Sequence, residues 1–222
     1  MWSFLVPLLL GFTSNAASAF TAAYSRRWGE RGGRVASLIL RNVLGIPVWA
    51  LGLVLAVRAP SRPLVRPGAV TAIAGWVLLA AGATLILWAL GSLGQRAAAP
   101  SARDTLVSDG AYSYVRHPIH VGTFLEFVGL WLLVLSLTAM VACMVGIIWL
   151  LVQSRLEETD LLERVSGYSQ YMADVPRFVP GLRRQCGAGR RMLSLRESLR
   201  PLQAQFNAGH GCLRFLALMS PT

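Results

Sequence analysis

The first two thirds of the chain alternate between long apolar runs and short polar segments. The apolar runs cover residues 1–23, 35–57, 69–93 and 119–152. A helix needs about 20 mostly apolar residues to cross a bilayer, so each of the first three runs predicts one spanning helix. The fourth run is too long for one typical span, and we expect two short spans that turn near residues 136–138. The pattern predicts an all-α fold, a polytopic membrane bundle of about five transmembrane helices.

Three features of these runs leave alternatives open. A cleaved signal peptide is the alternative for the first run, but no charged residue precedes its apolar part, so we expect a retained helix. Arg41 lies within the second run, close enough to its basic end to extend back to the interface. Glu126 is the only acid of the fourth run. An acid inside a span is costly and usually faces the bundle interior with a partner. Glu126 is therefore either structural, paired with Arg41 or a His, or functional.

The composition supports a membrane protein with an asymmetric charge. Hydrophobic residues make up 55% of the 222 and charged residues only 14%, against about a quarter in soluble domains. All 21 basic residues are Arg, the net charge is +11, and the segment from Arg177 onwards has one acid, Glu197. Such a basic segment is typical of contact with anionic membrane lipids. We expect no nucleic acid partner, because no recognition motif is present. We also expect no metal site, because the three Cys lack metal-binding spacing.

The distribution of Arg predicts the orientation in the membrane. With five spans, the 26–34 loop, the 94–117 loop and the segment after 153 lie on one side and hold most of the Arg residues, while the 58–66 loop lies opposite. The positive-inside rule then places the N-terminus outside and the C-terminus in the cytoplasm, in a bacterial-type inner membrane or a plasma membrane. The polar segments 110–122 and 155–181 consequently emerge on the same, cytoplasmic face.

These two segments concentrate the polar side chains near the last two spans. In "GAYSYVRHPIHVG", residues 110–122, Pro118 suits the first turn of a helix, so we expect a helix to begin near His117 or Pro118. The free N–H groups of that first turn favour an anion. In the segment 155–181, acids follow directly on the apolar run, and Leu residues at helical spacing predict that the last span continues as a helix. Taken alone, the first segment is typical of interfacial anchors and the second of a solvated helix. Because both are expected on the same face of the membrane, they indicate a common site.

The residues of both segments resemble one known superfamily. The stretch "LVSDGAYSYVRHPIHVG" resembles the motif L-V-x-x-G-x-Y-x-x-x-R-H-P-x-Y-x-G of the isoprenylcysteine carboxyl methyltransferase and phospholipid N-methyltransferase superfamily. The stretch "EETDLLERVSGYSQYMADVPRFVP" is similar to its E-E-x-x-L segment followed by Y-x-x-Y-x-x-x-V-P-R-F-x-P. The resemblance covers about 104–181. It implies an integral-membrane methyltransferase without a Rossmann domain, which uses S-adenosylmethionine in a cytoplasmic pocket and takes a lipid or lipid-linked acceptor from the bilayer.

The resemblance also implies roles for particular residues. Cofactor contacts fall on Asp104, Thr105, Leu106, Val107, Tyr112, His117, Pro118, Ile119, His120, Glu157 and Glu158. Arg155 would face the acceptor, and Arg116 would meet the cofactor carboxylate beside a helix N-terminus. His120 stands where the motif has Tyr, and it is our candidate general base for an amine or alcohol acceptor. The chain is also one residue shorter than the motif between the acid pair and Tyr168.

The sequence divides into three expected regions. Residues 1–100 form the N-terminal transmembrane helices, 101–181 the cofactor-binding region with its helical hairpin, and 182–222 a basic tail that is disordered or interfacial. Two other functions stay open: a non-catalytic membrane assembly module with a lipid-binding tail, and a membrane reductase of similar shape. The acceptor also stays open, because a phospholipid, a quinone-type molecule or another apolar compound fits equally well.

Overall fold

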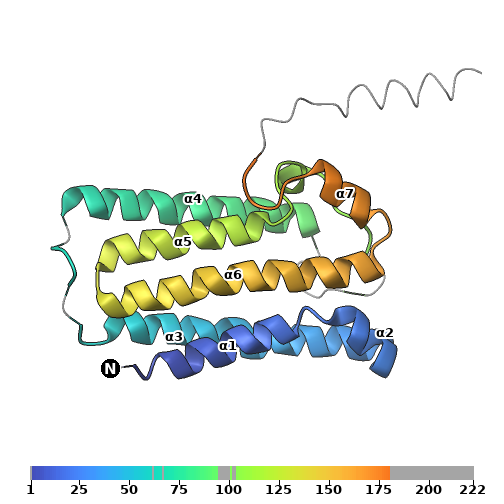
Figure 1. Cartoon of the computed structure of the whole chain (residues 1–222), viewed down its shortest axis with the longest axis horizontal. Helices are drawn as coiled ribbons and strands as arrows, with labels where there is room; N and C mark the ends of the chain where they lie inside the picture. Colours follow the sequence, from blue (N-terminus) through green and yellow to red (C-terminus); the bar gives the residue numbers. More distant parts are fainter. Residues whose placement is uncertain (1, 62, 67, 95–100, 102–103, 181–222) are drawn as a thin grey trace, which may run out of the picture. The chain divides into compact units, whose positions relative to one another are not determined.

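The described part of the chain is built from helices (Figure 1). The computed structural model describes residues 2–61, 63–66, 68–94, 101 and 104–180. The predicted tail, 182–222, lies outside the described residues. The elements are α1 (Leu5–Ala17), α2 (Thr21–Leu38), the π-helix η1 (Ile39–Gly45), α3 (Ile46–Arg58), α4 (Ala69–Leu93), the 3-10 helix η3 (Gly110–Ser113), α5 (Pro118–Val134), α6 (Leu137–Arg164) and α7 (Tyr168–Asp174).

Three helical runs are long and apolar enough to cross a membrane. They are Thr21–Arg58, which joins α2, η1 and α3, then Ala69–Leu93 and Leu137–Arg164. The apolar helices α1 and α5 are shorter. The expectation of an all-helical fold with helices suited to cross a membrane is therefore confirmed for the described residues, while the count of five spans stays a prediction. The first helix ends at Ala17, earlier than the apolar run suggested, and α2 begins only four residues later.

The predicted boundaries around the last two apolar helices are confirmed. Pro118 occupies the first turn of α5, with His117 as the residue before it. The hairpin turns at Leu135, whose φ of 47° is left-handed, and at Ser136, whose Oγ accepts a hydrogen bond from the Ala139 N–H (3.3 Å). Such a cap satisfies one of the free N–H groups at the start of α6. Helix α6 then continues without interruption to Arg164, so the acids near its end stand on the same helix as its apolar part.

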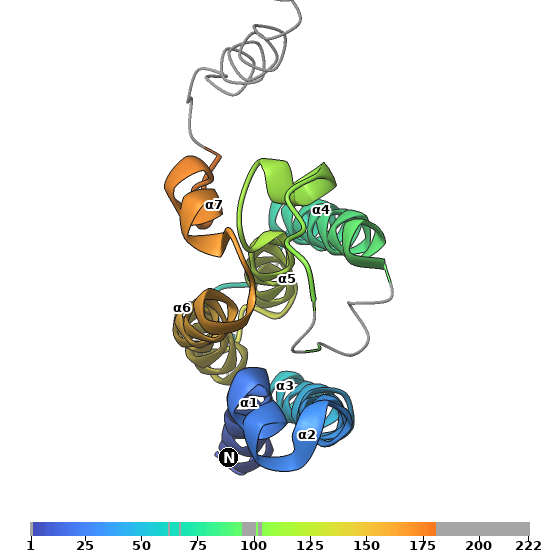
Figure 2. The same cartoon turned by 90° about the vertical axis from the view of Figure 1, so that its right-hand side faces the viewer.

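The helices form two pairs with α6 between them (Figure 2). Helix α4 packs along α5, and α1 packs along α3. Glycines allow the close contact of α4 and α5. A Cβ on Gly82 would lie 2.6 Å from the Gly122 carbonyl oxygen, and one on Gly122 would lie 2.7 Å from the Gly82 carbonyl oxygen. Small residues at such positions let two membrane helices approach closely, so α4 and α5 form one wall of the fold.

An aromatic core connects α6 to the other pair of helices. Phe12 of α1 stacks on Trp149 of α6 with ring centroids 4.5 Å apart, and Trp49 of α3 lies 6.2 Å from both Trp149 and Phe127. Aromatic contacts of this kind contribute about 0.5–1.5 kcal/mol each beyond the area they bury. This core supports the inner end of the cavity described next.

Candidate active site

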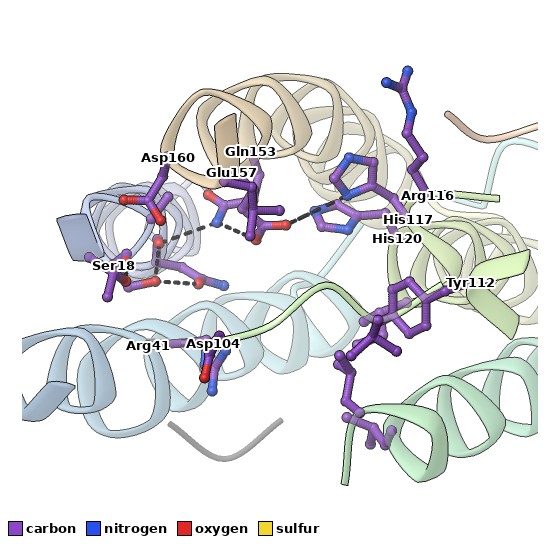
Figure 3. A pocket seen from close by; sticks show the side chains of 18 of the residues that line it. Ser18, Arg41, Asp104, Tyr112, Arg116, His117, His120, Gln153, Glu157 and Asp160 are labelled. Atoms are coloured by element: carbon purple, nitrogen blue, oxygen red, sulfur yellow. Dashed lines mark hydrogen bonds and ion pairs between the residues drawn. The ribbon is translucent and has the colours of Figure 1, made fainter. Parts of the chain in front are cut away.

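A cavity of about 540 Å³ lies among the helices where the two polar segments meet (Figure 3). Its size is in the range of small-molecule sites. Helices α1, α3, α4, α5 and α6 contribute to its walls, together with η1 and the segment 104–107. Its polar lining residues include Asn15, Ser18, Arg41, Asn42, Asp104, Tyr112, Arg116, His117, His120, Gln153, Glu157, Asp160, Arg164, Tyr168 and Tyr171. The two polar segments predicted to share a site do therefore meet at one cavity.

Glu158 organises the charged groups on one side of this cavity. It is 3% exposed, and its Oε1 lies 3.0 Å from His117 Nε2 and 3.4 Å from Arg116 Nη2. Arg177 donates to both carboxylate oxygens, its Nε at 3.0 Å from Oε1. The backbone brings these groups together, because the Arg116 N–H donates to the Pro176 carbonyl (2.9 Å) and the His117 N–H to the Arg177 carbonyl (3.2 Å). One buried carboxylate thus contacts both guanidinium groups and orients His117.

Glu157, the neighbouring acid on α6, faces the cavity. It accepts a hydrogen bond from Gln153 Nε2 (2.8 Å). Its Oε2 lies 3.6 Å from His117 Nδ1 and 3.9 Å from His120 Nε2. Successive residues of a helix point about 100° apart, so the two neighbouring acids face different environments. Glu158 holds the charged cluster together, whereas Glu157 presents a carboxylate to a bound molecule.

The position between the two acids determines the charge of His117. Burial alone lowers the pKa of its imidazole, but the hydrogen bonds to Glu157 and Glu158 outweigh burial and raise the pKa above its ordinary value. The imidazolium form is accordingly favoured. Burial raises the pKa of the Tyr112 and Tyr168 hydroxyls and raises the pKa of Tyr171 to about 12. These three phenols therefore stay protonated near neutral pH. The Tyr171 hydroxyl donates to the Tyr112 carbonyl (2.7 Å).

A second network holds the segment next to Asp104 against α6. Arg164 donates from Nε to Asp160 Oδ2 (2.6 Å) and from Nη1 to the Ser101 carbonyl (2.7 Å). The same Nη1 lies 3.3 Å from Asp104 Oδ2. Asp160 also accepts a hydrogen bond from the Ala22 backbone N–H (2.7 Å). This network joins α2, α6 and the connection that leads into the cavity wall at 104–107.

Most of the residues predicted for the site line the cavity. These are Asp104, Thr105, Leu106, Val107, Tyr112, Arg116, His117, Ile119, His120 and Glu157. Pro118 and Glu158 are buried but do not line it. Arg155 was predicted to face the acceptor, but it is exposed and does not line the cavity. The reason is its position two residues before Glu157, about 200° around the helix, and we no longer assign it that role.

Sequence reasoning missed the contribution of the first 58 residues. Asn15, Arg41 and Asn42 line the cavity together with Gln153 of α6, and Gln153 is only 2% exposed. The signal was present, since each is a polar residue within an apolar run. Arg41 and Asn42 lie on η1, and such π-helical turns are frequent at functional sites. The cavity therefore joins the regions 1–100 and 101–181 that the sequence analysis separated.

Three of the lining residues also have donor atoms in reach of a metal ion. One ligand atom each from His117, His120 and Glu157 lies within 4.8 Å of the others. Two imidazoles and a carboxylate are a donor set that zinc sites use. No metal site was expected from the Cys spacing, and this group of His and Glu residues arises from the start of α5 and from α6 instead. A divalent cation and a positively charged ligand would compete for the same Glu157 carboxylate.

The comparison with protein families decides the class of the central region. Residues 70–169 match the family described as phospholipid methyltransferase. This match confirms the resemblance that the two motifs indicated. That family is part of the superfamily of integral-membrane methyltransferases indicated by the two motifs. Neither the comparison with curated proteins nor that with solved structures gives a match.

The matched region of the phospholipid methyltransferase family agrees with the geometry of the site. It begins with α4 and ends at the start of α7. It contains His117, His120 and the acid pair Glu157 and Glu158 of α6, whereas Arg177 and the polar residues of α1 and η1 lie outside it. The charged cluster around Glu158 is thus mostly a feature of the family region, completed by one residue that follows it.

Proposed function

We propose that this protein transfers a methyl group from S-adenosylmethionine to a lipid or lipid-linked acceptor at the cytoplasmic face of a membrane. The observation that carries the proposal is the single cavity lined by both motif segments of a methyltransferase family. A scaffold protein has no need for a cluster of two Arg, two His and two acids beside such a cavity, because charges such as Arg116 and Glu158 are costly to bury unless they serve a purpose or are fully paired.

The polar groups of the cavity fit the charges of S-adenosylmethionine. Among the described residues, Nε and Nη1 of Arg116 are buried without a hydrogen-bond partner. A buried guanidinium with free N–H groups is suited to a carboxylate, and the cofactor carries one. Glu157 offers a carboxylate for the cationic part of the cofactor, and the Tyr112 ring offers an aromatic surface for adenine. The fit supports the cofactor assignment through Arg116, Tyr112, His117 and Glu157.

The residues of the cavity would act by positioning and by exclusion of water. When bound, S-adenosylmethionine supplies an activated methyl carbon on a sulfonium. Glu157 favours this cationic form over the neutral product, and apolar lining residues such as Leu106 and Trp149 keep water away. A carboxylate acceptor needs no base. An amine or alcohol acceptor must lose a proton, and two cavity residues can accept it: His120 and Glu126.

Transfer of labelled methyl groups to a lipid extract tests the proposal directly. Purified full-length protein with labelled S-adenosylmethionine should give a labelled lipid product, identified by mass. Glu157→Gln removes the cavity-facing charge and should lower the transfer rate about 10- to 100-fold, the effect of losing a charged hydrogen bond. Glu163→Gln is the matched control, because Glu163 lies on α6 outside the cavity lining and pairs with the exposed Arg26. Equal loss in both variants, or no labelled lipid with the wild type, would contradict the proposal.

A further inference from the structure

Glu126 is an acid of the cavity that the cofactor does not require. It lies on α5 and lines the cavity with Thr123 and Ile119. Its place in an apolar run predicts either a pairing with Arg41 or a His, or a functional role. Within the residues that the structure describes, Glu126 has no hydrogen bond and no ion pair. An unpaired carboxylate in a membrane helix is costly and marks a functional site.

The position of Glu126 separates it from the cofactor cluster. Ile119, Thr123 and Glu126 follow one another at helical spacing, so they form a stripe along the cavity that is about 10 Å long at about 1.5 Å per residue. Glu126 stands at the inner end of this stripe, and its side chain leans toward the N-terminal end of α5, as side chains on helices do. Gly82 of α4 makes room for it, since a Cβ there would lie 2.8 Å from Glu126 Cγ. The side chain of Glu126 thus extends along this stripe toward the cofactor cluster at the start of α5.

The cavity also reaches the apolar outer surface of the protein. Ile46 of α3 and Leu90 of α4 both line the cavity, and they are 41% and 37% exposed. Their helices lie at separate edges of the bundle, with α4 against α5 and α3 against α1 (Figure 2). Lining residues of the cavity are therefore exposed on helical runs that are apolar enough to cross a membrane.

We infer that Glu126 is the residue that recognises the methyl acceptor and that it selects a cationic amine over a carboxylate. The inference rests on the proposed methyl transfer. In a water-poor site the carboxylate attracts an ammonium strongly and repels a second carboxylate equally strongly. His120 is less suited to this task, because its Nε2 faces Glu157 (3.9 Å) and its ring lies against Trp149, with centroids 6.4 Å apart. His120 belongs to the cofactor end of the cavity, and Glu126 belongs to the acceptor end.

The proton balance agrees with this assignment. An ammonium has no lone pair, so it first gives one proton to the Glu126 carboxylate. The nitrogen lone pair then forms a bond to the methyl carbon, and the carbon–sulfur bond breaks with its electron pair on sulfur. The products are an N-methylammonium and S-adenosylhomocysteine. The proton on Glu126 returns to water, which restores the carboxylate for the next acceptor.

A matched pair of amphiphiles tests the inference. Dodecylamine and dodecanoate have the same chain length and opposite head-group charges. Binding is followed through the fluorescence of Trp49 and Trp149, which line the cavity, and turnover through methyl transfer from labelled S-adenosylmethionine. The wild type should prefer dodecylamine at least 10-fold in kcat/KM. Glu126→Gln should lower kcat/KM for dodecylamine about 10- to 100-fold. Glu126→Asp keeps the charge and should lose less activity. Glu163→Gln should have the same kcat/KM as the wild type.

The pH profile separates recognition from a merely structural role. With Glu126→Gln the amine must lose its proton to water, so the residual rate should rise with pH toward the pKa of the amine, about 10, more steeply than in the wild type. Unchanged amine turnover in Glu126→Gln, a preference for dodecanoate, or binding of neither amphiphile would overturn the inference. A different outcome would separate the two proposals. If the protein binds the amine through Glu126 but does not bind S-adenosylmethionine, the amine site is supported and the methyl-transfer proposal is refuted.

Discussion

Glu158→Gln is expected to lower the stability of the protein more than any other conservative change in the cavity region. The glutamine keeps the size of the side chain but leaves Arg116 buried without its counter-charge and His117 with one acid, Glu157, in place of two. Removing one partner of a buried ion pair costs about 3–5 kcal/mol in the free energy of unfolding. Thermal unfolding of the detergent-solubilised protein should show a Tm lower by roughly 10 °C. Cofactor affinity should fall as well, because Arg116 loses its orienting partner.

The matched control for this change is again Glu163→Gln. Glu163 is 48% exposed and pairs with Arg26 at the surface, and exposed pairs contribute about 0–1 kcal/mol. Its Tm should therefore stay close to that of the wild type. If Glu158→Gln unfolds at the same temperature as Glu163→Gln, the buried cluster does not support the fold in the way that its contacts suggest.

Arg164→Met should detach the cavity wall at 104–107 from α6. Methionine keeps much of the apolar stem but removes the guanidinium that joins Asp160, Asp104 and the Ser101 carbonyl. Asp160 is 7% exposed and would be left without its charged partner. We expect a loss of stability of about 3–5 kcal/mol and a weaker affinity for S-adenosylmethionine, since the released segment lines the cavity. Calorimetric titration and thermal unfolding on the same sample measure both effects.

Arg26→Met provides the comparison for Arg164→Met. Arg26 is 62% exposed and pairs with Glu163, so the same substitution there should change the free energy of unfolding by less than about 1 kcal/mol. An Arg164→Met protein that keeps the wild-type cofactor affinity would show that the network does not position residues 104–107.

The sequence predicted the parts of the fold that depend on local rules. Pro118 marked the start of α5, because proline fits only the first turn of a helix without the loss of a hydrogen bond. The uninterrupted helical spacing of Leu residues predicted that α6 continues past its apolar part. The meeting of His117 with the α6 acids followed from the two motifs, and the structure confirms it with contacts of 3.0 and 3.6 Å.

What the sequence could not predict depends on contacts between distant elements. Arg155 and Glu158 are three residues apart, yet only the packing of α6 against the 116–117 and 176–177 backbone decides that Glu158 is buried and Arg155 exposed. The contribution of Arg41 depends on how η1 lies beside the cavity, which no local pattern records. The proximity of Glu126 to Gly82 likewise arises from glycine contacts between α4 and α5.

Saturable binding of S-adenosylmethionine by the purified full-length protein tests the central claim most directly. Calorimetric titration should show one site in the wild type, with affinity lost in Glu157→Gln and His117→Ala and kept in Glu163→Gln. NADPH, the cofactor of the alternative reductase function, should not compete. Absence of S-adenosylmethionine binding in a folded wild-type protein, or displacement of it by NADPH, would contradict the account.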